Sequence, residues 1–318
     1  MSNRKLWIDC LRGIAILFVL YGHLVQGWND YFVFTSPIKI PLFFVITGYV
    51  FNHNRTNNKD FFVNLFIKLV VPWLLLSLLP ELLLIPKNGV YSCITDVWGI
   101  LLGKYFWYMP CCIIAEIIHF CILKLKNRNY IVVLSIMMAV FGYSTRNIAA
   151  FSYFMLNRAF FVQLFILVGY LLRDLKIDGN KKIIETVLYC GAGVYFLLGI
   201  LTMIMYPGKS LDVHLFHYYN VLVCLLMIFL GCGILVELFK CRNVSNKVLS
   251  FIGQNTLVFY LLGGYAQGLC SKIFSRFFGL ITPLSAIVVL LFMCAILSLA
   301  SVIINHYFPF MVGKWKNS

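Results

Sequence analysis

Apolar segments recur along the whole chain, and they restrict its fold more than any other feature. Of the 318 residues, 62% are hydrophobic and only 12% are charged, so the chain is far too apolar for an ordinary soluble domain. The segments that we interpret as membrane spans are residues 10–27, 38–52, 62–85, 92–122, 130–148, 157–172, 184–205, 217–239, 249–269 and 281–305. The sequence therefore predicts an all-α, polytopic membrane helix bundle of about ten transmembrane helices, surrounded by the lipid bilayer.

The fourth segment is the least regular of these. Residues 89–103 are only weakly apolar and include Asp96 and Trp98, whereas residues 106–123 are continuously apolar. We interpret the first part as an external helix lying on the membrane and the second as the true crossing. No polar loop is long enough to fold by itself, so we expect a single integral membrane domain over residues 1–318.

Lysine and arginine are distributed unevenly between alternate loops. If the amino terminus is inside and ten spans follow, 18 of the 26 basic residues fall in cytoplasmic segments. This excess on one side sets helix orientation, and it predicts cytoplasmic termini in a multi-pass protein of the cell (inner or cytoplasmic) membrane.

The first apolar segment is too long for a cleavable signal peptide and is expected to be retained. The net charge of +15 lies in these short clusters, which argues against a nucleic-acid partner.

The eleven cysteines show neither a disulfide pattern nor the spacing of a zinc site. Most of them lie in apolar stretches, where cysteine behaves as a small hydrophobic residue. We therefore expect packing roles for the cysteines and no bound metal.

Three ionisable residues stand out in the first span, within the sequence DCLRGIAILFVLYGH. Asp9, Arg12 and His23 fall on one face of the predicted helix. Arg12 and His23 are eleven residues apart, so their directions differ by about 20° and their axial separation is roughly 16 Å. The pattern predicts an anchoring charge near one membrane surface and an imidazole well inside. An ion pair of Asp9 with Arg12 and a buried, satisfied histidine are the simpler alternatives to a functional site.

The second span is short and is broken by Pro41 and Gly48, in the sequence PLFFVITGYVF. A glycine here allows close approach by a neighbouring helix or by a ligand, and packing is the more common reason. Farther on, Lys68 precedes Pro72 near the predicted inner surface. Lys68 is either a lysine that extends its charge into the interface or a phosphate contact.

The fourth span carries Glu116 and His119 three residues apart in WYMPCCIIAEIIHFCI. A carboxylate at that depth must be paired, protonated or exposed to water, and Arg158 of the sixth span is a candidate partner. Trp107 fits an interfacial aromatic belt, although aromatic side chains also stack on sugars.

Several of these motifs together resemble the membrane acyltransferase-3 family, and most closely its small sugar and polysaccharide O-acetyltransferase branch. The first two are DxxRGIAI followed by GH, and PLFFVITGY, which are fairly specific in combination. The others are Lys68 before Pro72, FWYMP, FILVGYLL and LSFIGQNTLVFYLLGGY, so the resemblance touches most of the chain. It implies about ten helices, an acyl-CoA donor reached from the cytoplasm, and transfer of an acyl group, usually acetyl, to a hydroxyl of an exported glycan.

In that family the arginine and the histidine of the first span are the functional pair, which here are Arg12 and His23. This sequence departs from the family pattern at some positions. Thr47 replaces a serine, the ninth-span motif offers Leu262 where a histidine is common, and the cytoplasmic arginine pair is not evident. We also expect no fused extracytoplasmic hydrolase-like domain.

These expectations combine into one functional hypothesis. Acetyl-CoA, the expected acyl donor substrate, binds with its phosphates near Arg12 and Lys68, and His23 acts as general base or as a transient acyl carrier. Thr47 or nearby backbone groups stabilise the oxyanion, with Asp9, Gly48, Tyr49 and Glu116 in support. Trp107 and Arg158, together with Glu116, contact a glycan or a lipid-linked sugar acceptor.

Two other classes of protein fit the same apolar pattern. A proton-coupled transporter or flippase of a polar metabolite or lipid-linked sugar would also have many spans and buried ionisable groups, although paired broken helices in corresponding halves are not evident. A structural or assembly subunit would leave His23 without a role. The acceptor, the acyl chain length and the oligomeric state are not specified by the sequence.

Overall fold

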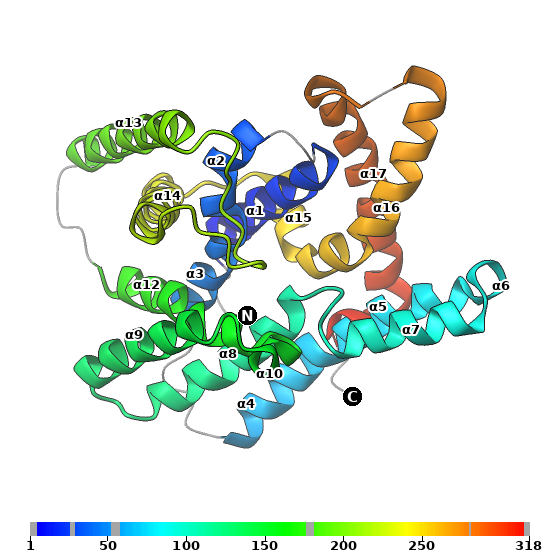
Figure 1. The fold of residues 1–318 in the computed structure, drawn as a ribbon, viewed down its shortest axis with the longest axis horizontal. Helices are drawn as coiled ribbons and strands as arrows, with labels where there is room; N and C mark the ends of the chain where they lie inside the picture. Colours follow the sequence, from blue (N-terminus) through cyan, green and yellow to red (C-terminus); the bar gives the residue numbers. More distant parts are fainter. Residues whose placement is uncertain (1–4, 26–28, 52–57, 176–180, 280, 315–318) are drawn as a thin grey trace. The chain divides into compact units, whose positions relative to one another are not determined.

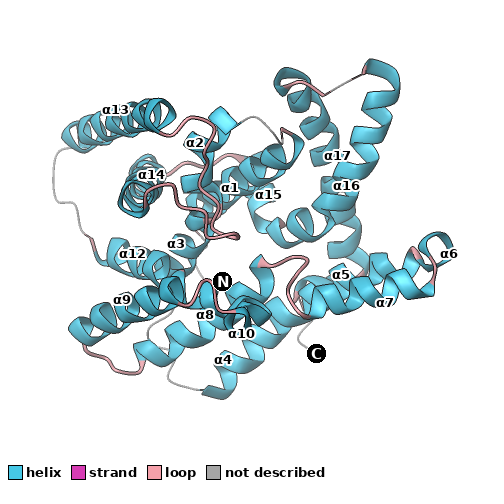
Figure 2. Cartoon of the chain, viewed as in Figure 1, coloured by secondary structure: helices cyan, strands magenta, loops and turns pink. Residues whose placement is uncertain are grey.

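The computed structural model describes residues 5–25, 29–51, 58–175, 181–279 and 281–314. Within these ranges the chain forms helices joined by short loops, and no strand is assigned (Figures 1 and 2). One isolated antiparallel bridge joins Asp212 and His217. The predicted cytoplasmic termini include residues 1–4 and 315–318, which lie outside the described ranges.

The helices follow one another closely along the chain. They are α1 (Leu6–Leu24), α2 (Asn29–Lys39), α3 (Pro41–Val50), α4 (Asn58–Leu65), the π-helical turn η1 (Phe66–Val70), α5 (Val71–Leu83), α6 (Ile85–Asn88), α7 (Val90–Leu101), α8 (Tyr108–Leu123), α9 (Arg128–Ser144), α10 (Ala149–Ser152), η2 (Tyr153–Met155), α11 (Leu156–Phe161), α12 (Gln163–Asp174), α13 (Lys181–Met205), α14 (Val221–Arg242), α15 (Lys247–Gln254), α16 (Thr256–Phe278), α17 (Pro283–Tyr307) and η3 (Pro309–Val312).

Eight helical segments among the described residues are long and apolar enough to cross a membrane. The shorter apolar helices α8 and α9 coincide with the predicted fourth and fifth spans, and α7 coincides with the predicted loop helix. The prediction of an all-α, polytopic membrane bundle is therefore confirmed.

Several predicted span boundaries differ from the observed ones. The second span, placed at residues 38–52, runs from Tyr31 to Val50, and two further differences bear on the site. The first span was placed at residues 10–27, but α1 begins at Leu6 and ends at Leu24, so every polar residue on it lies closer to the carboxy-terminal end than expected. The ninth span was placed at residues 249–269, but the chain breaks there into α15 and α16 at Asn255. The side chain of Asn255 donates a hydrogen bond to the carbonyl oxygen of Phe251 at 2.8 Å, as expected for an asparagine that competes with helical backbone bonding.

The chain divides into two compact units, and we describe each by itself. The first unit comprises Met1–Phe51, Phe165–Thr256 and Cys270–Phe292, and the second comprises Asn52–Leu164, Leu257–Leu269 and Met293–Ser318. In the first unit, α1 packs along α15 and also contacts α2, α3 and α14, while α13 packs on α14 and α2. The blue α1 and the yellow α15 lie side by side in Figure 1.

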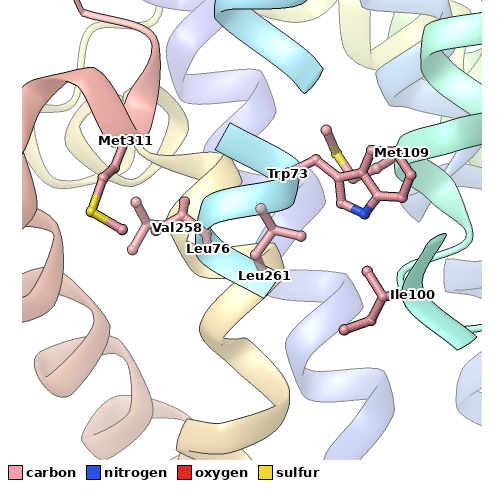
Figure 3. Close-up of a cluster of buried hydrophobic side chains, with 7 residues drawn as sticks. All are labelled: Trp73, Leu76, Ile100, Met109, Val258, Leu261 and Met311. Atoms are coloured by element: carbon pink, nitrogen blue, oxygen red, sulfur yellow. The ribbon is translucent and has the colours of Figure 1, made fainter. Parts of the chain in front are cut away.

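The second unit is built around two groups of helices. In one group α11 packs on α9 and α8, and in the other α5 packs on α7, η1 and η3. A buried hydrophobic cluster holds the second group together (Figure 3); its members are Trp73, Leu76, Ile100, Met109, Val258, Leu261 and Met311. All eleven cysteines lie within the described residues, and no disulfide joins any two of them.

Candidate functional site

The candidate site begins where α1 crosses α15 in the first unit. A Cβ atom added to Gly253 would lie 1.7 Å from the carbonyl oxygen of Asp9, and one added to Gly13 would lie 2.3 Å from that of Leu249. Real atoms never approach so closely, so both positions require glycine. The two backbones are in direct contact, as small residues allow in membrane helix packing. This contact fixes the first turns of α1 relative to α15.

Asp9 lies in the first turn of α1 and is only 2% exposed. Its Oδ2 atom accepts a hydrogen bond of 3.3 Å from Nε2 of Gln254, the last residue of α15. A buried carboxylate needs such partners to offset the loss of water. One residue further, the thiol of Cys10 lies 3.4 Å from the carbonyl oxygen of Asn246, the residue that caps α15.

Arg12 follows Asp9 by three residues and is half-buried in the second turn of α1. The crossing therefore holds Arg12 near the amino-terminal end of the helix, as the sequence predicts. Its guanidinium group suits bidentate binding of phosphate.

His23 lies in the last turn of α1, one residue before the helix ends, and its side chain is exposed. The sequence placed this imidazole well inside the first span; because α1 ends at Leu24, the imidazole lies closer to the helix end than a span to residue 27 implies. The order along the helix is as predicted, with Arg12 near one end and His23 near the other. An exposed imidazole at a helix end is accessible to a reacting molecule without displacement of the protein core.

Lys39, the last residue of α2, lies next to this end of α1. A Cβ atom added to Gly22 would lie 3.4 Å from the Lys39 Nζ atom and 3.2 Å from the ring of Phe32. The same ammonium group is 4.5 Å from the centroid of the Phe32 ring, a cation–π distance. It also interacts electrostatically with His23. The sequence did not single out Lys39, because nothing local to residue 39 indicates that it is adjacent to residue 22.

The glycine of the second span serves a helix crossing. A Cβ atom added to Gly48 would lie 1.9 Å from the carbonyl oxygen of Ile166, and one added to Gly169 would lie 1.9 Å from that of Val45. Helices α3 and α12 are thus in backbone contact through a reciprocal pair of glycines. Of the two interpretations left open for Gly48, close packing of a neighbouring helix is the one that the structure shows.

The residues on either side of Gly48 also have structural partners. The Thr47 hydroxyl group donates a hydrogen bond of 3.0 Å to the carbonyl oxygen of Phe43, within its own helix. The proton expected to stabilise an oxyanion is therefore engaged by the helix backbone. Tyr49 is buried, and its ring meets that of Trp7 edge-on at 5.3 Å.

The remaining candidates lie in the second unit, and three of them are close to α8. Trp107 immediately precedes α8 and contacts the ring of Tyr108 edge-on at 6.4 Å. Glu116 is half-buried, with its Oε1 atom 3.9 Å from the Cys112 thiol. Arg158 donates through Nη1 to Oδ1 of Asn157 at 2.8 Å. The predicted pairing of Arg158 with Glu116 stays a prediction.

Two buried polar residues, one within α8 and one packed against it, were given no role from the sequence. Gln163 is fully buried and donates through Nε2 to the carbonyl oxygens of Ala115 at 2.9 Å and Ala159 at 3.2 Å. His119 is also fully buried. A glutamine inside the apolar run FFVQLFIL is the signal that could have found the first of these, because buried polar groups in a membrane span need specific partners.

Lys68 lies in the π-helical turn η1 and is exposed. The chain near the carboxyl terminus packs against this turn, since a Cβ atom added to Gly313 would lie 2.9 Å from the Cα atom of Lys68. Single π-helical turns are frequent at functional positions. The exposed ammonium group is compatible with both interpretations of Lys68, interfacial anchoring and phosphate binding.

Two further carboxylates near apolar spans are satisfied locally. Glu81 accepts a hydrogen bond of 2.6 Å from the Tyr265 hydroxyl group, and Glu237 pairs with Lys240 at 3.1 Å. No group of three or more histidine, cysteine or acidic side chains that could hold a metal ion is found in the part of the chain that the structure describes.

A comparison with known families shows to which family the chain belongs. The sequence profile of the acyltransferase 3 family, described as an acyltransferase domain, matches residues 5–304, which contain both ends of α1 and every candidate residue above. Neither the curated proteins nor the solved structures give a match. The chain is a multi-pass membrane protein, and the match over nearly its whole length shows that it belongs to the acyltransferase 3 family.

Proposed function

We propose that this acyltransferase moves an acetyl group from acetyl-CoA to a hydroxyl group of an exported or surface glycan, within the cell (inner or cytoplasmic) membrane. The observation that carries the proposal is the placement of Arg12 and His23 near opposite ends of α1. On a regular helix the two side chains are about 20° apart in direction and roughly 16 Å apart along the axis. A phosphate-binding cation and a proton acceptor are thus separated along one stripe of a single helix.

The donor is bound at the amino-terminal end of α1. Arg12 is positioned there by the backbone contact of α1 with α15, and the buried Asp9 beside it is held by Gln254. We assign to Arg12 the binding of the phosphates of acetyl-CoA from the cytoplasmic side. Lys68, exposed on its π-helical turn, is a second candidate for this role.

The reaction takes place at the carboxy-terminal end of α1. His23 acts as general base and removes the proton of the acceptor hydroxyl group as its oxygen attacks the thioester carbonyl carbon. The tetrahedral intermediate then collapses with cleavage of the carbon–sulfur bond. The departing thiolate then takes the proton from the imidazole. The exposure of His23 suits this role, because both the thioester and the acceptor must reach the imidazole.

The acceptor in this proposal is a glycan or a lipid-linked sugar. Trp107 offers an aromatic face for a sugar ring, and Arg158 and Glu116 offer charged hydrogen-bonding groups for sugar hydroxyls. These three assignments follow from the chemistry of the side chains.

Purified protein in lipid vesicles tests the proposal directly. Radiolabelled acetyl-CoA is supplied with a surface glycan preparation, and both thiol release and glycan acetylation are followed, the latter by mass spectrometry. We expect acetyl groups to appear on the glycan with stoichiometric release of CoA, and we expect neither product with the His23→Ala variant. Movement of a sugar across the vesicle without consumption of acetyl-CoA would instead show a carrier and would overturn the proposal.

The exposed Lys209 provides a matched control, because it lies in the loop that follows α13 and has no assigned role. The Lys209→Met variant should retain wild-type transfer. Orientation of the protein in the vesicles is checked by protease digestion, so that loss of activity in the His23 variant is not confused with misinsertion.

A further inference from the structure

The structure suggests which group stabilises the charge that develops in this reaction. We propose that the ammonium group of Lys39 acts as the electrophilic catalyst beside His23, binding the oxyanion formed when the acceptor hydroxyl attacks the thioester. This inference rests on the proposed function and assigns to it a residue outside the motifs that identify the family.

The first support is position. A Cβ atom added to Gly22 would have three nearest neighbours outside α1. They are ring carbons of Phe32 and Tyr31 and the Nζ atom of Lys39, which would lie 3.4 Å away. The ammonium group is therefore the only polar group among them, directly beside the residue that precedes His23. A cation in that place lies at the same end of α1 as His23, and it interacts electrostatically with the imidazole.

The second support is the way in which Lys39 is held. Its side chain is half-buried, and its Nζ atom rests over the Phe32 ring at 4.5 Å from the centroid. Because α2 ends at Lys39 and α3 starts at Pro41, the lysine is fixed at the junction of the two helices. A preorganised donor of this kind stabilises a transition state without first paying for its own ordering.

The third support is a carboxylate that balances the charge. Asp212, in the loop between α13 and α14, interacts electrostatically with Lys39. The loop is well defined: Asp212 and His217 exchange two backbone hydrogen bonds of 3.0 Å, and Oδ1 of Asp212 accepts the backbone N–H of Leu215 at 3.0 Å. Leu211 and Val213 on either side are buried.

This arrangement matches the charges that the reaction creates. Proton transfer makes the imidazole positive while the carbonyl oxygen becomes negative. A nearby ammonium group stabilises the negative oxygen and destabilises the positive imidazole. Asp212 interacts electrostatically with Lys39 and so favours the positive charge on which this role depends. Thr47, the oxyanion donor expected from the sequence, gives its proton to Phe43 and leaves this role to another group.

Atoms and electrons balance in the proposed step. The acceptor oxygen forms a bond to the carbonyl carbon, its proton passes to His23, and the π electrons of the carbonyl bond move to the oxygen beside Lys39. Collapse of the intermediate returns those electrons, breaks the carbon–sulfur bond and transfers the proton from His23 to the thiolate. The products are the acetyl ester and free CoA.

Steady-state kinetics of four purified variants test the proposal. Lys39→Met should lower kcat by about 100- to 1,000-fold, the usual loss when one oxyanion donor is removed, while the KM for acetyl-CoA stays near the wild-type value. Lys39→Arg should retain more activity, since it keeps the positive charge. Lys209→Met serves again as the exposed control and should be unaffected.

The double variant Lys39→Met/Asp212→Asn separates catalysis from simple charge neutralisation. If Lys39 stabilises the oxyanion, the kcat of the double variant stays as low as that of Lys39→Met. If Lys39→Met does not fold, the double variant is measured in its place. Recovery of wild-type kcat in the double variant, or a Lys39→Met variant that keeps wild-type kcat, would overturn the inference. An active His23→Ala variant would instead overturn the proposed function itself.

Discussion

At its amino-terminal end α1 is in backbone contact with α15, whereas at its carboxy-terminal end it carries an exposed histidine beside the lysine that ends α2. The first end is held by Gly13 and Gly253 and buries Asp9 completely. The second end has a buried glycine at residue 22 but leaves the His23 side chain exposed.

In the proposed mechanism, the difference between the two ends corresponds to two tasks. Binding a flexible donor requires a cation that does not move, and direct backbone contact between helices provides that rigidity. Proton transfer requires a side chain that two substrates can reach, and a helix end provides that access. The comparison therefore predicts that changes at the first end affect stability and donor binding, while changes at the second end affect the chemical step.

The largest structural effect is expected at the crossing of α1 and α15. The Gly253→Ala variant places a methyl group where the Asp9 carbonyl oxygen lies 1.7 Å away, so the helices must separate. Overpacking of this kind costs about 1–3 kcal/mol. We expect a lower midpoint of thermal unfolding in detergent, together with a loss of donor binding.

Gly193 in α13 provides the control, because a Cβ atom added there meets nothing within 4 Å. Gly193→Ala should be neutral or stabilising by up to about 1 kcal/mol, given the helix propensity of alanine. Equal unfolding midpoints for the two alanine variants would contradict the account of the crossing.

Removal of the proposed phosphate contact should raise the KM for acetyl-CoA. Arg12→Gln removes charge-assisted hydrogen bonds worth about 1.5–3 kcal/mol, which corresponds to roughly a 10- to 100-fold weaker interaction. The kcat value should change little. The KM of the Arg12→Lys variant should fall between those of the wild type and the Arg12→Gln variant. A fall in kcat at unchanged KM would place Arg12 in the chemical step and remove the distinction between the ends.

Gln254 is expected to have a smaller effect, because its hydrogen bond is to Asp9, three residues before Arg12. Gln254→Leu removes the 3.3 Å hydrogen bond to Asp9 and should raise the KM for acetyl-CoA by up to about tenfold. Gln254→Glu places a second carboxylate beside that of Asp9, so its KM for acetyl-CoA should be higher than that of the leucine variant. An unchanged KM for acetyl-CoA in the Gln254→Leu variant would show that the hydrogen bond does not position the donor-binding end.

Thr47 should show the smallest effect of the series. Its hydroxyl group bonds to the carbonyl oxygen of Phe43 in the same helix, and such bonds contribute little to helix stability. Thr47→Val should therefore keep kcat within about threefold of the wild type. A loss comparable with that expected for Lys39→Met would return the oxyanion role to Thr47.

The fold class and the order of groups along α1 could be predicted from sequence because both depend on local periodicity. Apolar runs identify the spans, and the eleven-residue separation of Arg12 and His23 sets their relative direction on any regular helix. The helix boundaries were less predictable. Asn255 separates α15 from α16, but hydropathy alone reads through this residue as part of one continuous span, residues 249–269.

The neighbours of each site residue could not be predicted, because they come from distant parts of the chain. Lys39 is adjacent to Gly22, and Gly253 meets Asp9, only through tertiary packing. The hydrogen bond of Thr47 is local, yet a threonine in a membrane helix can equally present its hydroxyl group to a ligand. The sequence identifies residues capable of the chemistry, and packing determines which of them are available for it.

The central claim is that His23, at the exposed end of α1, performs the proton transfer. The most direct measurement is kcat for acetyl transfer by purified His23→Gln and His23→Ala proteins that match the wild type in thermal unfolding. Loss of a general base predicts a fall in kcat of about 100- to 10,000-fold, with the KM for acetyl-CoA unchanged. Transfer at the wild-type rate by either variant would contradict the account.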